Sequence, residues 1–101
     1  MGCQIIISTA ASKDLQQSYD WYENVETDLG FRFIDFVDKV LGIIELYPES
    51  FPCKKDRFRE AALKRFPYLI IYEYSPEENK VFVLHVFHSH RHPRRKLRTK
   101  R

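Results

Sequence analysis

The sequence predicts an α+β fold of the order β-α-α-β-β-β, with an N-terminal antiparallel helical hairpin packed on a mainly antiparallel sheet. Two segments with helical periodicity come first, and β-branched and aromatic runs follow them. Helices that precede a meander of strands are typical of α+β sandwiches. The chain has 101 residues, of which 44% are hydrophobic, which suits one domain with a modest core. We expect that domain at residues 1–93 and a basic tail at 94–101.

The first strand and the first helix are expected near the N-terminus. Residues 4–8 form a short β-branched run that favours a strand. Ser12 is the expected helix N-cap, which places Asp14 in the first turn, where negative charge is favourable. One face of the helix is apolar, and its flank is widened by Trp21, which we expect to pack at the helical hairpin and not at a functional site. The apolar face is predicted to comprise Leu15, Tyr19 and Tyr22, widened by Trp21 and Val25.

A second helix is predicted to start in the turn-like segment 27–30 and to end before Pro48, which disfavours helix at Tyr47. Because the connection between the two helices is so short, they must fold back as an antiparallel hairpin. The apolar stripe recurs at three- and four-residue spacing. Its members are Phe33, Val37, Val40, Ile44 and Tyr47.

The second half of the chain predicts a loop and three strands. Residues 48–59 have loop character, with two prolines and four basic residues, and a strand is expected at about 59–66. Two further strands, 68–74 and 81–87, flank a polar turn and predict a β-hairpin. On the first of these, neither face is clearly polar. One face packs on the helices, and we expect a concave aromatic surface around Tyr72 and Tyr74 to be available to a partner.

Charge is distributed unevenly along the chain. Residues 1–47 carry three Lys/Arg against eight Asp/Glu (−5), and residues 80–101 carry eight Lys/Arg and no acid (+8). Such a basic end suits phosphate or an acidic protein; the alternative is a solvated tail that aids solubility. No apolar run has the length of a membrane span, so we expect no membrane partner and a cytoplasmic location. Cys3 and Cys53 are expected to be ordinary reduced thiols.

An ordered set of short motifs is similar to one known family. Their sequence is Ala11-x-x-Asp14-Leu15, Trp21-Tyr22-Glu23, Leu29-Gly30-x-Arg32-Phe33, Ile44-x-x-x-Pro48, Arg65-Phe66-Pro67-Tyr68-x-Ile70-x-Tyr72 and Val83-x-x-Val86-x-His88-x-x-Arg91-x-Pro93. Together they resemble the RelE/ParE superfamily of bacterial toxins, often called plasmid stabilisation proteins, over about residues 4–93. The resemblance implies the toxin of a type II toxin–antitoxin system, which inhibits growth, is neutralised by a cognate antitoxin in a hetero-oligomer, and acts on DNA gyrase or on the ribosome and mRNA.

The family divides on mechanism. RelE-like members are metal-independent endoribonucleases that cleave mRNA in the ribosome, which requires acid–base groups and cations around the phosphate. The catalytic counterparts in this chain are His88 and His90, since histidine titrates near neutrality. The expected phosphate- or target-binding residues are Lys54, Arg57, Arg65, Tyr68 and Arg91.

The departures from the nuclease pattern favour the ParE-like branch, whose members poison DNA gyrase. Tyr68 stands where the nucleases carry an arginine, and no Arg or Lys occurs in residues 68–74. His88 then has a structural interpretation, bonded to a loop carbonyl. A third class stays open, namely a non-toxic nucleic-acid-binding or regulatory domain with the same fold.

The four histidines of the C-terminal region also permit a metal-site interpretation, which we disfavour. His88, His90 and His92 share one face of an extended segment and His85 points to the other. No acidic or Cys ligand accompanies them, and the neighbouring arginines disfavour a cation. We therefore expect no metal and no cofactor.

Overall fold

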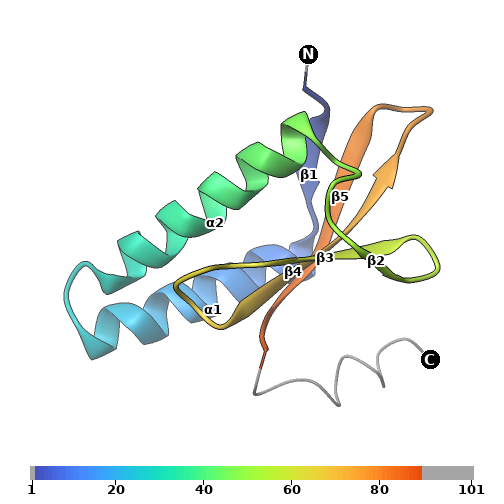
Figure 1. The fold of residues 1–101 in the computed structure, drawn as a ribbon. Helices are drawn as coiled ribbons and strands as arrows, with labels where there is room; N and C mark the ends of the chain where they lie inside the picture. The colour runs from blue at the N-terminus through green and yellow to red at the C-terminus, as the bar shows by residue number, and fades with distance from the viewer. Residues whose placement is uncertain (1, 90–101) are drawn as a thin grey trace.

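The computed structural model describes residues 2–89 (Figure 1). It has two layers, because the antiparallel helices α1 and α2 lie on one face of a five-stranded sheet. Within residues 2–89, no helix is long and apolar enough to cross a membrane. The elements are β1 (Gln4–Ile7), α1 (Thr9–Val25), α2 (Leu29–Leu46), β2 (Cys53–Lys55), β3 (Phe58–Ala62), β4 (Tyr68–Ser75) and β5 (Lys80–His88).

The strands follow the order β1-β5-β4-β3-β2 across the sheet. β1 runs parallel to β5, and the other neighbours are antiparallel, which confirms the mainly antiparallel α+β prediction. The prediction of 48–59 as loop is wrong in part, since β2 lies within it and pairs with β3. This strand has three residues, two of them lysines, so it is too short and too polar to show an alternating pattern.

Helix α1 starts four residues earlier than predicted. Its N-cap is Ser8, whose hydroxyl accepts a hydrogen bond from the Ala11 amide at 3.0 Å. The prediction of Ser12 as N-cap is wrong because β1 ends at Ile7, and Ser8 is the first residue free to cap a helix. Asp14 therefore lies beyond the first turn of the helix, and its carboxylate accepts a hydrogen bond from strand β5 instead.

Helix α2 is capped by a side chain of α1. Asp28 occupies the N-cap position in the left-handed region, at φ 74°, without a side-chain cap bond of its own. The carboxylate of Glu23 instead accepts from the amides of Asp28 at 3.0 Å and Gly30 at 2.8 Å. Gly30 also permits close helix packing, because a Cβ there would meet the Tyr19 carbonyl oxygen at 2.7 Å. One carboxylate thus ties the two helices together and satisfies two of the amide donors at the start of the second.

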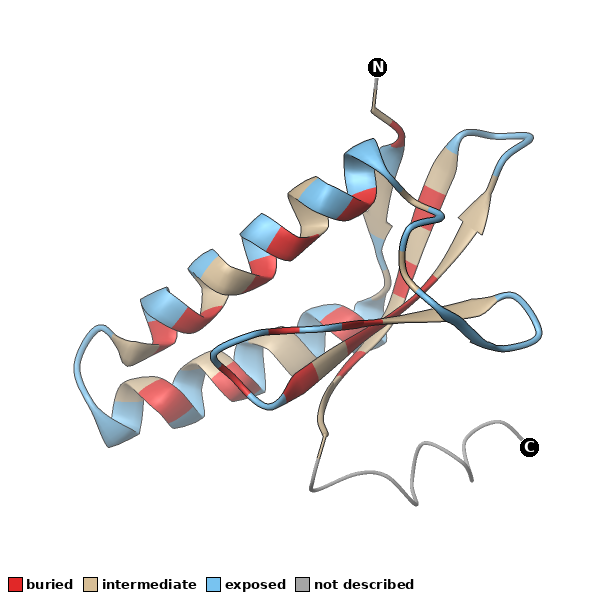
Figure 2. Ribbon diagram, in the orientation of Figure 1, coloured by how far each residue is buried: buried red, intermediate tan, exposed pale blue. Residues whose placement is uncertain are grey.

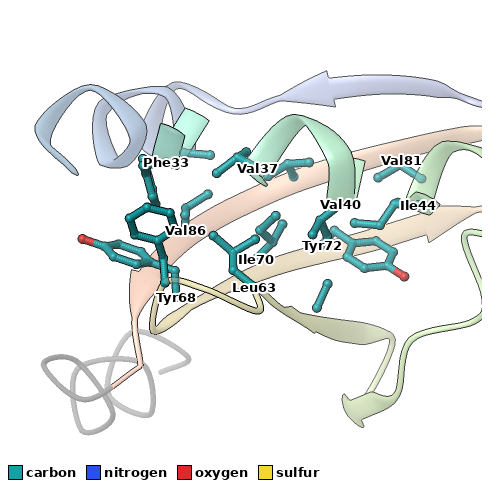
Figure 3. Packing of buried hydrophobic residues seen from close by; sticks show 14 of the residues in the cluster. Phe33, Val37, Val40, Ile44, Leu63, Tyr68, Ile70, Tyr72, Val81 and Val86 are labelled. Atoms are coloured by element: carbon teal, nitrogen blue, oxygen red, sulfur yellow. The ribbon is translucent and has the colours of Figure 1, made fainter. Parts of the chain in front are cut away.

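The core lies between the two helices and the sheet (Figure 3). The predicted stripe is confirmed at four of its five positions, which are all buried: Phe33, Val37, Val40 and Ile44. It is wrong for Tyr47, which is 63% exposed beyond the end of the helix. Figure 2 shows the buried positions of both helices on the sides that face inward.

Strand β4 presents its aromatic face to the helices. Tyr68 and Tyr72 are buried, and the Tyr72 hydroxyl donates to the Pro48 carbonyl at 2.7 Å. The prediction of an open aromatic surface around Tyr72 and Tyr74 is therefore wrong, because burial of these rings removes more apolar area from water than burial of the other face. The open face instead carries Leu69, Ile71 and Glu73.

Trp21 is half-exposed rather than packed in the helical hairpin. Its exposed fraction is 50%, whereas the buried residues of α1 are Ala11, Ser18 and Tyr22. Trp21 lies one residue from Tyr22, and thus roughly 100° around the helix from the buried stripe. Its ring makes an edge contact with Tyr22 at 5.0 Å. The prediction that Trp21 packs in the hairpin is therefore wrong.

Candidate functional site

A groove of about 540 Å³ lies on the face of the sheet that the helices leave open. Its floor includes Ile71, which is only 7% exposed although it points away from the core. Lysines of β2 and the first residues of α1 also line it. The lining residues are Ser8, Ala10, Lys54, Lys55, Asp56, Phe58, Glu60, Ile71, Leu84, His85 and Phe87.

A β-bulge in β5 shapes the groove. Ile71 pairs with His85 and Tyr72 pairs with Val83, so Leu84 is an extra residue on β5. The bulge is held by Ser8, whose hydroxyl donates to the Leu84 carbonyl at 2.9 Å. The N-cap of α1 thereby also fixes the place where β5 shifts its register.

Beyond the bulge, α1 replaces β1 as the neighbour of β5. The Asp14 carboxylate accepts from the Val86 amide at 2.9 Å and lies 3.5 Å from His85 Nδ1. The His85 ring stacks on Phe87, with centroids 5.2 Å apart and planes 15° apart. The carboxylate and the ring together fix the orientation of a partly exposed imidazole inside the groove.

Two basic residues from the β2–β3 hairpin occupy different positions. Lys54 lines the groove, and it is the one predicted site residue within residues 2–89 that does so. Arg57 follows Asp56, which has φ 53°, and its guanidinium pairs with the Glu73 carboxylate at 3.2 Å. This exposed pair lies near the far end of β4 and contributes little to stability.

The other predicted residues lie on the side of the sheet that bears the helices. Tyr68 is 2% exposed within the core, so its side chain presents almost no surface to a target. His88 is its partner on β5, and the two rings meet edge to face at 5.3 Å. The Arg65 guanidinium lies 5.9 Å from the centre of the Phe36 ring of α2. His88 and Lys54 therefore lie on opposite faces of the sheet, which the sequence alone did not indicate.

His90 and Arg91 lie outside the described residues, as does His92. Within residues 2–89, no group of three or more His, Cys, Asp or Glu side chains is arranged to hold a metal ion. The groove offers one imidazole and two ammonium groups above an apolar floor, together with two carboxylates, Asp56 and Glu60. Such a mixed lining suits a peptide with apolar and charged side chains.

Sequence reasoning missed His85, Asp14 and Ser8. Alternation along the strand correctly predicts that His85 lies on the opposite side from His88. Its place in the groove depends on which face of β4 is open, and alternation did not decide this, since both faces of β4 are apolar. The one signal in the sequence was that the face with Tyr68, Ile70 and Tyr72 carries aromatic rings, whereas the face with Leu69, Ile71 and Glu73 carries none.

Comparison with known proteins connects this arrangement to toxin–antitoxin systems. Residues 5–93 match the family model described as ParE toxin of the type II toxin–antitoxin system parDE. No curated protein matches the sequence. A chain of the chromosomal ParDE toxin–antitoxin system from P. aeruginosa has a TM-score of 0.71 at 12% identity, covering 83% of this chain and 92% of that one. A chain of the RelBE2 toxin–antitoxin complex from Mycobacterium tuberculosis has a TM-score of 0.59 at 17% identity, with coverage of 87% and 99%.

Proposed function

Because the chain belongs to the ParE toxin family of type II toxin–antitoxin systems, we propose that it arrests growth by binding DNA gyrase in the cytoplasm and not by cleaving RNA. The observation that carries this proposal is the separation of the predicted catalytic residue His88 from the predicted phosphate-binding residue Lys54. His88 lies on the helix-bearing side of the sheet beside Tyr68, whereas Lys54 lines the groove on the other side. A general base must reach its proton within about 3 Å, so these two residues cannot serve the same phosphate.

The open face of β4 also disfavours a nuclease. It carries Leu69, Ile71 and Glu73 where a cleaving enzyme needs cations for the pentavalent phosphate. Arg57 lies close by, but its charge is engaged by Glu73 at 3.2 Å. A carboxylate beside the phosphate would oppose the charge that develops during cleavage.

We further propose that a cognate antitoxin covers the groove. The two similar solved structures come from toxin–antitoxin systems, and the groove combines an apolar floor around Ile71 and Leu84 with the ammonium groups of Lys54 and Lys55. An acidic, amphipathic segment fits this lining, because its apolar side chains cover the floor and its carboxylates meet the lysines. Arg91 and the tail, residues 94–101, are proposed to add attraction for the antitoxin or for the target.

One observation favours a second candidate, an mRNA endoribonuclease. His85 is oriented by Asp14 at 3.5 Å in the same groove as Lys54. A histidine held by a carboxylate is a recurrent general base. If the chain cleaves RNA, His85 is therefore the acid–base residue to test, ahead of His88 and His90.

Two assays with the purified chain distinguish these mechanisms. We expect inhibition of gyrase supercoiling and no ribosome-dependent cleavage of mRNA. The double variant His88→Gln, His90→Gln and the single variant His85→Gln should both keep gyrase inhibition, since a binding surface tolerates such changes better than proton transfer does. Cleavage of mRNA that His85→Gln abolishes, without loss of folding, would overturn the proposal in favour of the nuclease.

Measurements of antitoxin binding test the proposal that the antitoxin covers the groove. Lys54→Glu should weaken antitoxin binding and reduce its salt dependence. Lys64→Glu is the matched control, since Lys64 is an exposed lysine of the β3–β4 loop that does not line the groove. Equal loss of affinity in the control and in the groove variant would place the antitoxin elsewhere.

A further inference from the structure

The two edges of the sheet are built differently. β2 forms one edge and has the features by which proteins prevent edge strands from pairing with other chains. It has only three residues, follows Pro52, contains Lys54 and Lys55, and has an irregular register against β3. This edge is closed to a further strand.

β1 forms the other edge, and although it is also short, with four residues, it lacks the charges, the preceding proline and the irregular register of β2. Its sequence is Gln-Ile-Ile-Ile, without charge, proline or glycine, and its register with β5 is regular from Gln4 to Ile7. Its β-branched residues favour extended backbone. Ile7 is 38% exposed. An uncharged edge of this composition is a template for another strand.

The direction of the main-chain groups can be followed along β1. The amides of Gln4 and Ser8 donate toward β5, to Asn79 at 3.1 Å and to Val83 at 2.9 Å. Because successive amides of a strand point to opposite sides, those of Ile5 and Ile7 point away from β5. The same alternation holds at Cys3, whose amide donates to the Glu45 carbonyl of α2 at 3.1 Å. The end of α2 thus covers the amide of Cys3, which is the first that points away from β5. The next main-chain groups that point away from β5 are those of Ile5 and Ile7.

We propose that β1 pairs with β1 of a second copy of this chain, in antiparallel orientation about a two-fold axis at Ile6. Ile5 then lies opposite Ile7 of the second copy, and Ile7 opposite its Ile5. Each of these two pairs exchanges two main-chain hydrogen bonds, four in all. The two sheets join into one, with both helical hairpins on the same side.

The edge can pair with a second copy of itself without a mismatch. In the register about Ile6, the outward main-chain groups of Ile5 and Ile7 meet those of Ile7 and Ile5 of the second copy. The edge has no charge, and pairing it with itself therefore brings no like charges together. Ile6 is the partner of Phe82 and faces the open side of the sheet. At the axis, Ile6 meets its own counterpart in a closely spaced, non-hydrogen-bonded pair.

Sedimentation of the purified full chain over a concentration series tests this dimer. We expect a concentration-dependent dimer in the wild type and monomers in both Ile6→Lys and Ile6→Glu, because like charges then meet at the axis. An equimolar mixture of the two variants should dimerise again. Leu69→Lys is the matched control, since it places the same charge on the open face of an interior strand, and it should leave the dimer intact.

A second variant covers the case in which a charge at Ile6 prevents folding. Ile7→Pro removes an amide that points away from β5, so the pairing of β1 with β5 is preserved and the intermolecular bonds are lost. Folding is checked by circular dichroism, and the variant should be monomeric. A wild type that is monomeric throughout the series, or a folded Ile7→Pro variant that dimerises as the wild type does, would overturn the proposal.

Discussion

Tyr72 is a buried hydroxyl whose contribution to stability changes sign with pH. Tyr72→Phe removes the hydrogen bond to the Pro48 carbonyl, 2.7 Å long, and leaves the ring in the core. At neutral pH we expect this variant to lose about 1–2 kcal/mol, because the partly buried Pro48 carbonyl loses its donor. The variant is thus less stable than the wild type under these conditions.

In alkaline solution we expect the variant to become more stable than the wild type. Burial raises the pKa of Tyr72 to about 12, from 10.0. The folded state therefore holds a proton that the unfolded state releases above pH 10, and the stability of the wild type falls as pH rises from 10 to 12. A difference of about two pKa units sets an upper limit of roughly 2–3 kcal/mol, which solvent screening reduces. Since phenylalanine does not titrate, the two stability curves should cross within this window.

Urea denaturation followed by circular dichroism, at neutral pH and in steps above pH 9, measures both effects. The difference between variant and wild type cancels the contributions of the other tyrosines and of the lysines. A difference that keeps its neutral-pH value up to the alkaline limit of folding would refute the burial of the hydroxyl and the reasoning built on it.

Three further predictions use the same denaturation measurement. Gly30→Ala should destabilise by about 1–3 kcal/mol, since the added Cβ meets the Tyr19 backbone at 2.7 Å. Gly42→Ala has open space around it and should stabilise by about 0.5–1 kcal/mol. Equal effects of the two substitutions would contradict the close helix contact at Gly30. Asp14→Ala should cost about 1–3 kcal/mol and Asp14→Asn less, because only the amide keeps an acceptor for β5. Trp21→Ala should cost less than the roughly 3–5 kcal/mol of a fully buried residue, and a larger loss would contradict its exposure. Deletion of 94–101 should weaken antitoxin binding and flatten its salt dependence, measured by titration at two ionic strengths.

The order of elements was predictable because each long element carries its own periodic signal. The stripe from Phe33 to Ile44 specifies α2, and Pro48 ends it. The failures occurred where a local choice depends on distant residues. Ser8 and Ser12 are equally good caps in isolation, and the end of β1 decides between them. The choice of face on β4 was decided by the helices that cover Tyr72.

The candidate site was predictable only in part, for a related reason. Lys54 was found because a basic run is visible in the sequence. His85 enters the groove through the bulge at Leu84, which Ser8 holds, and through the carboxylate of Asp14; the bonds of Ser8 to Leu84 and of Asp14 to Val86 join residues more than 70 positions apart. No window of sequence contains both partners of such a contact.

The Ser8 hydroxyl has a consequence for the time at which the groove forms. It joins the start of α1 to the Leu84 carbonyl, 76 residues later in the chain. The helical hairpin closes through near neighbours and can form early, but contacts of such high separation form late and slowly. During synthesis, β1 must wait until β5 has left the ribosome before the sheet can close around it. The groove, which Leu84, His85 and Phe87 of β5 help to line, therefore forms only after β5 has been synthesised and paired.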